Sequence, residues 1–257
     1  MIRSYERIKV ERAGGVETIA LSNPPRRNAI GPRMMNELLW ALEDARAADE
    51  VRSIVLTGEG KAFCSGGDFT GATHDSELPH KGDFADLLLA LYRSDKPVIA
   101  KVNGDALGGG LGLAAACTFA VASSGAKLGT PEIDVGLFPM MIMAVLARRI
   151  PRRRLTEMML FGEKLDAEEA ARIGLVNRAV APGELDAAVK AITDAIASKS
   201  ATTVRLGLRA MADEDDLDLE RALPMLRDRL SEVLATDDAR EGLMAFLEKR
   251  APRWTGR

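Results

Sequence analysis

Two glycine-rich stretches each follow a short apolar run that is typical of a buried strand. The first is Gly60 to Asp68 (GKAFCSGGD), and the second is Asn103 to Gly112 (NGDALGGGLG). Glycines allow positive φ angles and let a ligand approach the backbone closely, although they can also serve only to make tight turns. The small apolar residues after Gly110 predict a buried helix whose positive N-terminal end faces the second stretch. Together, the two stretches are typical of a site for an anion or a developing oxyanion.

A third stretch, Gly129 to Pro139 (GTPEIDVGLFP), places acidic residues among apolar ones. Glu132 stands between Pro131 and Ile133. It is either a structural acid that caps a helix or forms an ion pair, or a carboxylate whose pKa is raised for proton transfer. Taken alone, Glu132 is better explained as structural. Beside two loops that could bind an oxyanion, a positioned carboxylate predicts a site that forms and reprotonates an enolate.

Other mechanisms lack their characteristic residues. No GxxxxGK[ST], HExxH or GxSxG motif occurs, and the two cysteines have no metal-binding spacing, so we expect no metal site. Residues 110–115 fit GxGxxA, but loop residues separate them from the preceding strand, which disfavours a dinucleotide site. A serine hydrolase would need His74 or His80 to fold back onto Ser65. Cys64 is expected to be a packing residue rather than a nucleophile.

The elements that must position these residues alternate between strands and helices in the first half of the chain. Alternation of apolar and polar residues around Gly14 and Gly15 predicts a β-hairpin, and from about Phe138 onward the pattern is almost wholly helical. We therefore predict an α/β fold with a core over residues 1–195 and a helical region over residues 196–257. The expected strands are 8–11, 16–21, 51–57 and 97–102, and the expected helices of the first half are 32–45 and 84–92.

The composition is that of an ordinary globular protein. The 257 residues are 47% hydrophobic and 28% charged, with 35 basic and 38 acidic side chains and a net charge of -3. No basic excess suggests a nucleic-acid partner. The apolar stretches are shorter than the roughly 20 residues that span a membrane, and the charged N-terminus lacks the apolar core of a signal peptide. With no disulfide framework, the cytoplasm is the expected compartment.

The three stretches, together with others in the same order, resemble the crotonase superfamily, also called the enoyl-CoA hydratase/isomerase family. The similarity covers nearly the whole chain. Each segment alone is a weak signal, but their order and spacing together are specific. Besides the three stretches, the segments that carry the resemblance are 21–30 (LSNPPRRNAI), 162–170 (GEKLDAEEA), 174–177 (GLVN) and 246–250 (FLEKR).

The resemblance implies a crotonase-like spiral of ββα units, with a helical C-terminal region that assembles the chain into a homotrimer or a dimer of trimers. It also implies an acyl-CoA thioester substrate, in which coenzyme A is part of the substrate and not a cofactor. By position, the backbone N–H groups of Ser65 and Gly109 would hold the thioester oxygen, and Glu132 would be the acid/base. The other residues expected at the substrate are Arg27, Ala62, Phe63, Gly66, Gly67, Asp68, Gly108, Gly110, Gly112, Pro131, Met140 and Lys249. A solvated surface charge is an equally good interpretation of Arg26, Arg27 and Lys249.

Two departures from the family pattern bear on the reaction. Hydratases of this family usually use two glutamates to place and activate a water, and the first of these positions is Gly112 here. A single acid favours a double-bond isomerase over a hydratase. The alternatives are a hydratase whose second acid comes from elsewhere, and a catalytically weak homologue that only binds acyl-CoA. The candidate second acids are Asp68, Asp105 and Asp134.

The second departure is the segment from Met140 to Met143, which stands where many relatives carry a glycine-rich turn. Methionines are flexible and could form the wall of an acyl pocket. They could equally form the core-facing side of a helix, which we expect for at least one of them.

Overall fold

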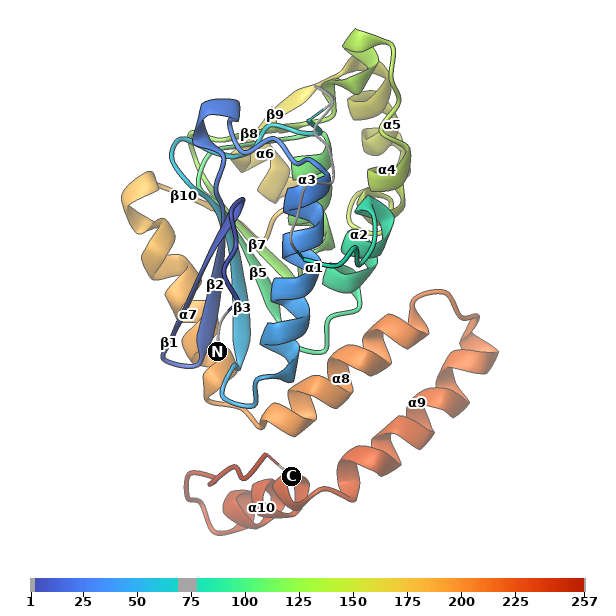
Figure 1. Cartoon of the computed structure of the whole chain (residues 1–257). Helices are drawn as coiled ribbons and strands as arrows, with labels where there is room; N and C mark the ends of the chain where they lie inside the picture. Colours follow the sequence, from blue (N-terminus) through green and yellow to red (C-terminus); the bar gives the residue numbers. More distant parts are fainter. Residues whose placement is uncertain (1–2, 69–77, 257) are drawn as a thin grey trace.

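The computed structural model describes residues 3–68 and 78–256. Its centre is a six-stranded sheet in the order β1-β2-β3-β5-β7-β10, with an antiparallel β1–β2 hairpin and parallel pairing between the other neighbours (Figure 1). All six residues of β3 are buried, as in parallel strands that are covered on both faces. The strands are β1 (Ile8–Ala13), β2 (Val16–Leu21), β3 (Ser53–Gly58), β5 (Val98–Val102), β7 (Phe119–Ser123) and β10 (Arg178–Val180).

A second sheet contains four short strands in the order β4-β6-β8-β9. These are β4 (Ala62–Cys64), β6 (Asp105–Leu107), β8 (Lys127–Gly129) and β9 (Lys164–Asp166). Strands β4, β6 and β8 each follow a strand of the first sheet along the chain. The chain thus passes repeatedly from the large sheet to the small sheet and then to a helix, which confirms the expected spiral of ββα units. A Cβ at Gly104 would overlap the Lys61 carbonyl oxygen, so only glycine fits where the two glycine-rich stretches cross.

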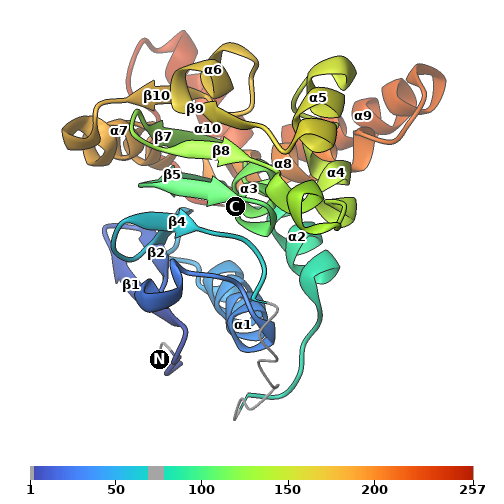
Figure 2. The ribbon, with the colours of Figure 1, turned by 90° about the horizontal axis from the view of Figure 1, so that it is seen from above.

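Helices cover both sides of the large sheet. Figure 2 shows α1 and α7 on opposite sides of it, and Val189 of α7 packs against Ile99 and Val121 of the sheet. None of the described helices is long and apolar enough to cross a membrane. The α-helices are α1 (Pro32–Ala47), α2 (Phe84–Tyr92), α3 (Gly109–Ala116), α4 (Met140–Leu146), α5 (Arg152–Phe161), α6 (Ala167–Arg172) and α7 (Leu185–Ala197), and the short 3-10 helices are η1 (Pro24–Arg26), η2 (Pro131–Val135) and η3 (Pro182–Glu184).

The last three helices form an arm that stands away from the body in Figure 1: α8 (Ala201–Glu214), α9 (Leu219–Leu234) and α10 (Asp237–Leu247). We call residues 201–256 the C-terminal arm. The buried Asp238 carboxylate accepts hydrogen bonds from the Thr255 N–H at 2.6 Å and the Ser200 hydroxyl at 2.6 Å. These bonds tie the end of the chain to the start of α8.

The predicted hairpin is confirmed by the antiparallel pairing of β1 with β2. Gly14 and Gly15 form its turn with positive φ angles of 57° and 79°, as a two-residue hairpin turn requires. The sequence pattern does not reveal β9 and β10, which are too short for alternation to stand out. The expected boundary after residue 195 falls in the last turn of α7, and the division into two parts stays a prediction.

Candidate active site

Glu132 is the acid of the candidate site. It lies in η2, directly after β8, and a Cβ placed on Gly108 would be only 2.7 Å from its Oε1 atom. Its Oε2 atom is buried and has no hydrogen-bond partner in the described part of the chain. Burial raises the pKa of Glu132, opposed by a hydrogen bond to its own backbone N–H. A half-buried carboxylate with one unpaired oxygen can take or return a proton.

Gly108 brings the acid and the second glycine-rich stretch together. Its φ of 51° lies in the left-handed region, which glycine adopts without strain. Its N–H donates to the Gly129 carbonyl at 2.9 Å, so pairing of β6 with β8 holds this loop against the segment that carries Glu132. The close approach of the carboxylate also leaves no space for a side chain at residue 108.

The N-terminus of α3 supplies free backbone donors beside this carboxylate. Gly112 is the first residue of the helix to close a helical hydrogen bond, donating to Gly108 O at 3.1 Å. The N–H groups of Gly109 and Gly110, in the first turn, therefore have no partner within the helix. Gly110 packs so tightly on Cys64 of β4 that a Cβ would overlap the Cys64 carbonyl oxygen. The two glycine-rich stretches thus lie against each other.

The structure does not support the role expected of the Ser65 amide. This N–H donates to the Arg27 carbonyl at 3.0 Å, and the Ser65 hydroxyl bonds to the Arg26 carbonyl at 3.2 Å. Both polar groups therefore hold in place the segment 21–30, which we call the early loop. Because the Ser65 N–H is occupied, another amide of the stretch must serve if a second donor is needed.

Gly67 has an amide that remains available. Ile30 bridges the residues on either side of it, donating to Gly66 O at 2.8 Å and accepting from Asp68 N at 2.9 Å. The Gly67 N–H consequently faces away from Ile30, and it makes no hydrogen bond to a described residue. Gly67 was expected only as a substrate contact. The Ser65 amide is bonded and the Gly67 amide is free because of contacts with Arg27 and Ile30. These two residues lie nearly forty residues earlier in the sequence.

Two apolar side chains lie beside Gly109. A Cβ on Gly109 would lie 3.3 Å from Cζ of Phe84 and 3.7 Å from Cγ2 of Ile30. Phe84 begins α2, whose N-terminus is fixed by a capping box between Asp83 and Asp86. The sequence analysis did not single out Phe84 or Ile30. The D-x-x-D spacing before an apolar run was the local signal that could have placed Phe84 at a helix start.

Three residues near the first glycine-rich stretch are packing residues. Ala62, Phe63 and Cys64 are buried in the core, so any contact of Ala62 or Phe63 with substrate would have to come from the backbone. Burial also raises the pKa of the Cys64 thiol to about 11. The interpretation of Cys64 as a packing residue is therefore confirmed.

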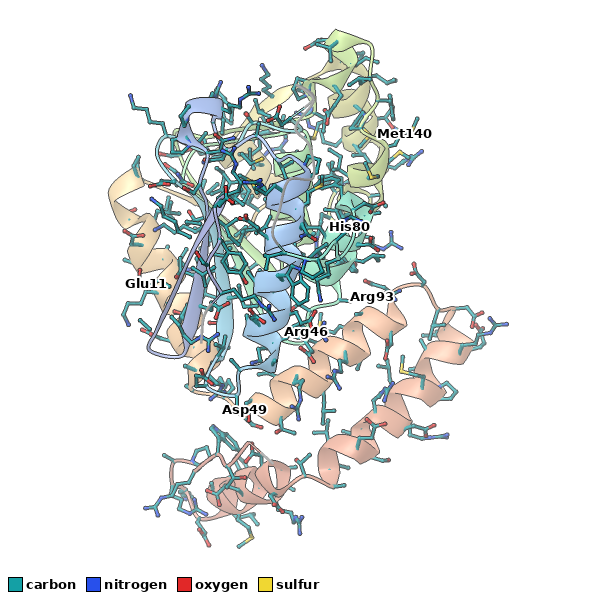
Figure 3. The ribbon with its side chains drawn as sticks, in the orientation of Figure 1. Glu11, Arg46, Asp49, His80, Arg93 and Met140 are labelled. Carbon is teal, nitrogen blue, oxygen red and sulfur yellow. The ribbon has the colours of Figure 1, made fainter. Side chains whose placement is uncertain are left out.

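Ile142 fills the space beside Gly112 where a second acid would stand. A Cβ on Gly112 would overlap Cγ2 of Ile142 and lie 2.9 Å from its Cβ. Close helix packing, and not an open space, is therefore what the structure shows at this position. Met143 packs against the core beside Ile142, which confirms a core-facing role for one methionine, whereas Met140 is 64% exposed at the start of α4 (Figure 3).

The three candidate second acids have structural contacts of their own. Asp68 pairs with Arg26 at 3.1 Å, and Asp105 pairs with Arg27 at 2.6 Å. Both ion pairs fix the early loop on the glycine-rich stretches. The Asp134 carboxylate lies against the end of α5, 2.9 Å from a Cβ placed on Gly162.

Two of the expected charged contacts are not gathered at Glu132. Arg27 is exposed on the early loop, near the stretches but paired with Asp105. Lys249 follows α10, which lies at the opposite end of the molecule from α3 in Figure 1. His80 lies in the segment before α2, and His74 lies outside the described residues.

Comparison with known proteins agrees with this architecture. The family model described as enoyl-CoA hydratase/isomerase matches residues 11–257. A crotonyl-CoA hydratase of Syntrophomonas wolfei is 34% identical over 253 residues, covering 96% of this chain and 97% of the relative. The mitochondrial enoyl-CoA hydratase domain-containing protein 3 of Mus musculus is 32% identical, over 94% of this chain and 82% of the relative. The cytoplasmic expectation therefore does not follow from the similarity.

The similarity extends to solved structures. The crystal structure of an enoyl-CoA hydratase from Mycobacterium smegmatis superposes with a TM-score of 0.90 at 33% identity, over 97% of this chain and 99% of that one. The fold, the order of the glycine-rich and acidic stretches, and the full-length matches lead to one conclusion. This chain belongs to the enoyl-CoA hydratase/isomerase family, the crotonase family, of enzymes that act on acyl-CoA thioesters.

Proposed function

We propose that the protein moves a carbon–carbon double bond of an enoyl-CoA by proton transfer through a thioester enolate. One observation carries this proposal: Glu132, whose buried Oε2 atom has no partner among the described residues, lies against Gly108, next in sequence to the free Gly109 amide, while Ile142 fills the place of a second acid. Enolate formation needs donors for the oxygen and one base. Hydration needs in addition a group that orients water, and no second carboxylate occupies that place here.

In the proposed reaction, the thioester oxygen accepts hydrogen bonds from the N–H groups of Gly67 and Gly109. Glu132 removes a proton from the substrate carbon, and the electrons of the broken C–H bond pass into the conjugated enolate. The same carboxyl group returns the proton to a different carbon, which shifts the double bond and restores the carboxylate. Preorganised amides stabilise the enolate strongly because they need not reorient as charge develops.

A hydratase is the second candidate, and the names of the relatives favour it. In that reaction Glu132 alone would orient the water and exchange its protons. A binding protein without catalysis is the third possibility, and turnover of any enoyl-CoA by the pure protein would exclude it.

The Ser65 hydroxyl and the Gly109 amide can be tested by substitutions that separate side chain from backbone. Ser65→Ala should leave turnover nearly unchanged, because the Ser65 hydroxyl bonds only to the early loop. Gly109→Pro removes an oxyanion donor and should lower kcat by about 10²–10³, with further loss from backbone distortion. Initial rates with a 3-enoyl-CoA and circular dichroism of each variant provide the comparison. A Ser65→Ala enzyme as inactive as Gly109→Pro would instead indicate a serine nucleophile.

We further propose that the C-terminal arm joins copies of the chain into a homotrimer or a dimer of trimers. The arm exposes large apolar side chains, including Leu223 at 58% and Phe246 at 81% exposure, and exposed apolar patches commonly mark interfaces. Lys249, remote from Glu132 of its own chain, would then contact the CoA phosphates of a neighbouring copy.

The assembly can be measured by sedimentation equilibrium. The wild-type protein should have three or six times the 27.6 kDa of one chain, and Leu230→Glu with Leu234→Glu should produce smaller species. The matched control, Leu230→Met with Leu234→Met, should assemble normally. A monomeric wild-type protein would contradict the proposed assembly.

A further inference from the structure

A cavity lies between the body and the C-terminal arm. It has a volume of about 520 Å³ and is lined by the end of α1, the segments before β3 and β5, and the first turns of α8. In Figure 3, Arg46 and Asp49 mark its place at the lower end of the body, whereas Met140 lies at the upper end. No residue of η2 or α3 lines it. This cavity is therefore separate from the Glu132 site, and we call it the Arg205 cavity.

Positive charge predominates in the Arg205 cavity. Two acidic side chains, Asp49 and Asp95, face five basic ones, which leaves an excess of three positive charges. The basic residues are Arg46, Arg52, Lys96, Arg205 and Arg209. An excess of this size in a concave site attracts anions.

Asp95 fixes two of these arginines. Its buried carboxylate accepts hydrogen bonds from Nε of Arg46 at 3.2 Å and from Nε of Arg209 at 3.1 Å. One carboxylate thus serves two guanidinium groups, and each of them keeps further N–H donors. The Lys96 ammonium is held in the wall by the Ala45 carbonyl at 2.9 Å. These groups are positioned by the protein and are not free surface chains.

Arg205 is a charge of the cavity that has no partner among the described residues. It lies four residues before Arg209 in α8, so the two side chains share one face of the helix. Arg209 pairs with Asp95, but Arg205 makes no hydrogen bond or ion pair with any residue that the structure describes. Arg52 also lines the cavity. Its Nη2 donates to the carbonyl of Lys199, just before α8, at 2.6 Å.

We propose that the Arg205 cavity binds a small ligand that carries two or more phosphate groups. Guanidinium groups match phosphate oxygens in pairs, and three surplus charges suit a multivalent anion better than a single carboxylate. The cavity volume falls within the range of small-molecule sites, roughly 300–1,000 Å³. The chain as a whole has a net charge of -3, without the basic excess that is typical of nucleic-acid binding.

Calorimetric titration with inorganic pyrophosphate tests this proposal. The wild-type protein should bind it with a Kd below about 1 mM at low salt, and inorganic phosphate should bind at least about tenfold more weakly because it carries less charge. Arg52→Gln with Arg205→Gln should weaken pyrophosphate binding at least about tenfold, and Arg205→Lys should weaken it less because it keeps the charge. Arg178→Gln removes an exposed arginine that does not line the cavity, and should bind as the wild type does.

Two further measurements locate the ligand. Glu132→Gln should bind pyrophosphate normally, because it lies outside the cavity, and Arg205→Gln should leave the KM for acyl-CoA unchanged. Absence of a pyrophosphate signal at 10 mM (about ten times the expected limit) would overturn the proposal. Equal binding by the Arg52→Gln, Arg205→Gln protein would also overturn it, and so would a raised KM in Arg205→Gln, which would assign these arginines to acyl-CoA itself.

Discussion

Replacing Glu132 by glutamine is expected to lower the rate of proton exchange at the substrate carbon by about 10²–10⁴. Glutamine keeps the shape of the side chain but cannot act as the base. Because Oε2 has no partner among the described residues, the substitution leaves no other group unpaired, and the fold should persist. Deuterium incorporation from D2O into an acyl-CoA, followed by mass spectrometry, measures the exchange directly.

Asp134→Asn is the matched control for Glu132→Gln. It neutralises an acid two residues away whose carboxylate lies against Gly162, so exchange should continue at nearly the wild-type rate. The wild-type rate should also fall as the pH drops through the raised pKa of Glu132, because only the ionised carboxylate accepts a proton. Normal exchange by Glu132→Gln would show that another group is the base.

Gly112→Glu is expected to destabilise the protein rather than create a hydratase. A Cβ at this position would already overlap Ile142, and overpacking of a core commonly costs about 1–3 kcal/mol. Burial of a carboxylate without a partner adds to this cost. The melting temperature of the variant should therefore fall.

Ile142→Ala provides the matched test of this contact, since it removes the Cγ2 atom that would clash. The double variant Gly112→Glu, Ile142→Ala should be less destabilised than the two single variants predict together, because the two sites touch. Urea unfolding of the four proteins gives the coupling free energy. A Gly112→Glu protein that is as stable as the wild type would contradict the packing seen here.

The local sequence predicts those features that depend on local chemistry. Glycine is needed at Gly104 and Gly108 for close approach of backbone and carboxylate, and these requirements leave a visible pattern. The apolar neighbours of Glu132 likewise predict its burial. The meeting of the two glycine-rich stretches with Glu132 could therefore be anticipated, whereas the spiral of ββα units was expected only from the resemblance to the crotonase family.

Long-range partners decide the features that the sequence could not predict. Whether Ser65 or Gly67 offers a free amide depends on Arg27 and Ile30, which lie in a different segment. The occupant of the space beside Gly112 is Ile142, some thirty residues further along the chain. A glycine indicates that there is little room for a side chain at its position. Its neighbours in the sequence do not show which distant side chain packs there.

The products formed from two substrates test the proposed single-carboxylate proton transfer most directly. The wild-type protein is incubated separately with a 3-enoyl-CoA and with a trans-2-enoyl-CoA, and the products are identified by mass spectrometry and chromatography. Proton transfer by Glu132 predicts interconversion of the two enoyl isomers with no change in mass. A gain of one water by the 2-enoyl substrate, at the rate of the main reaction, would contradict this mechanism and identify the protein as a hydratase.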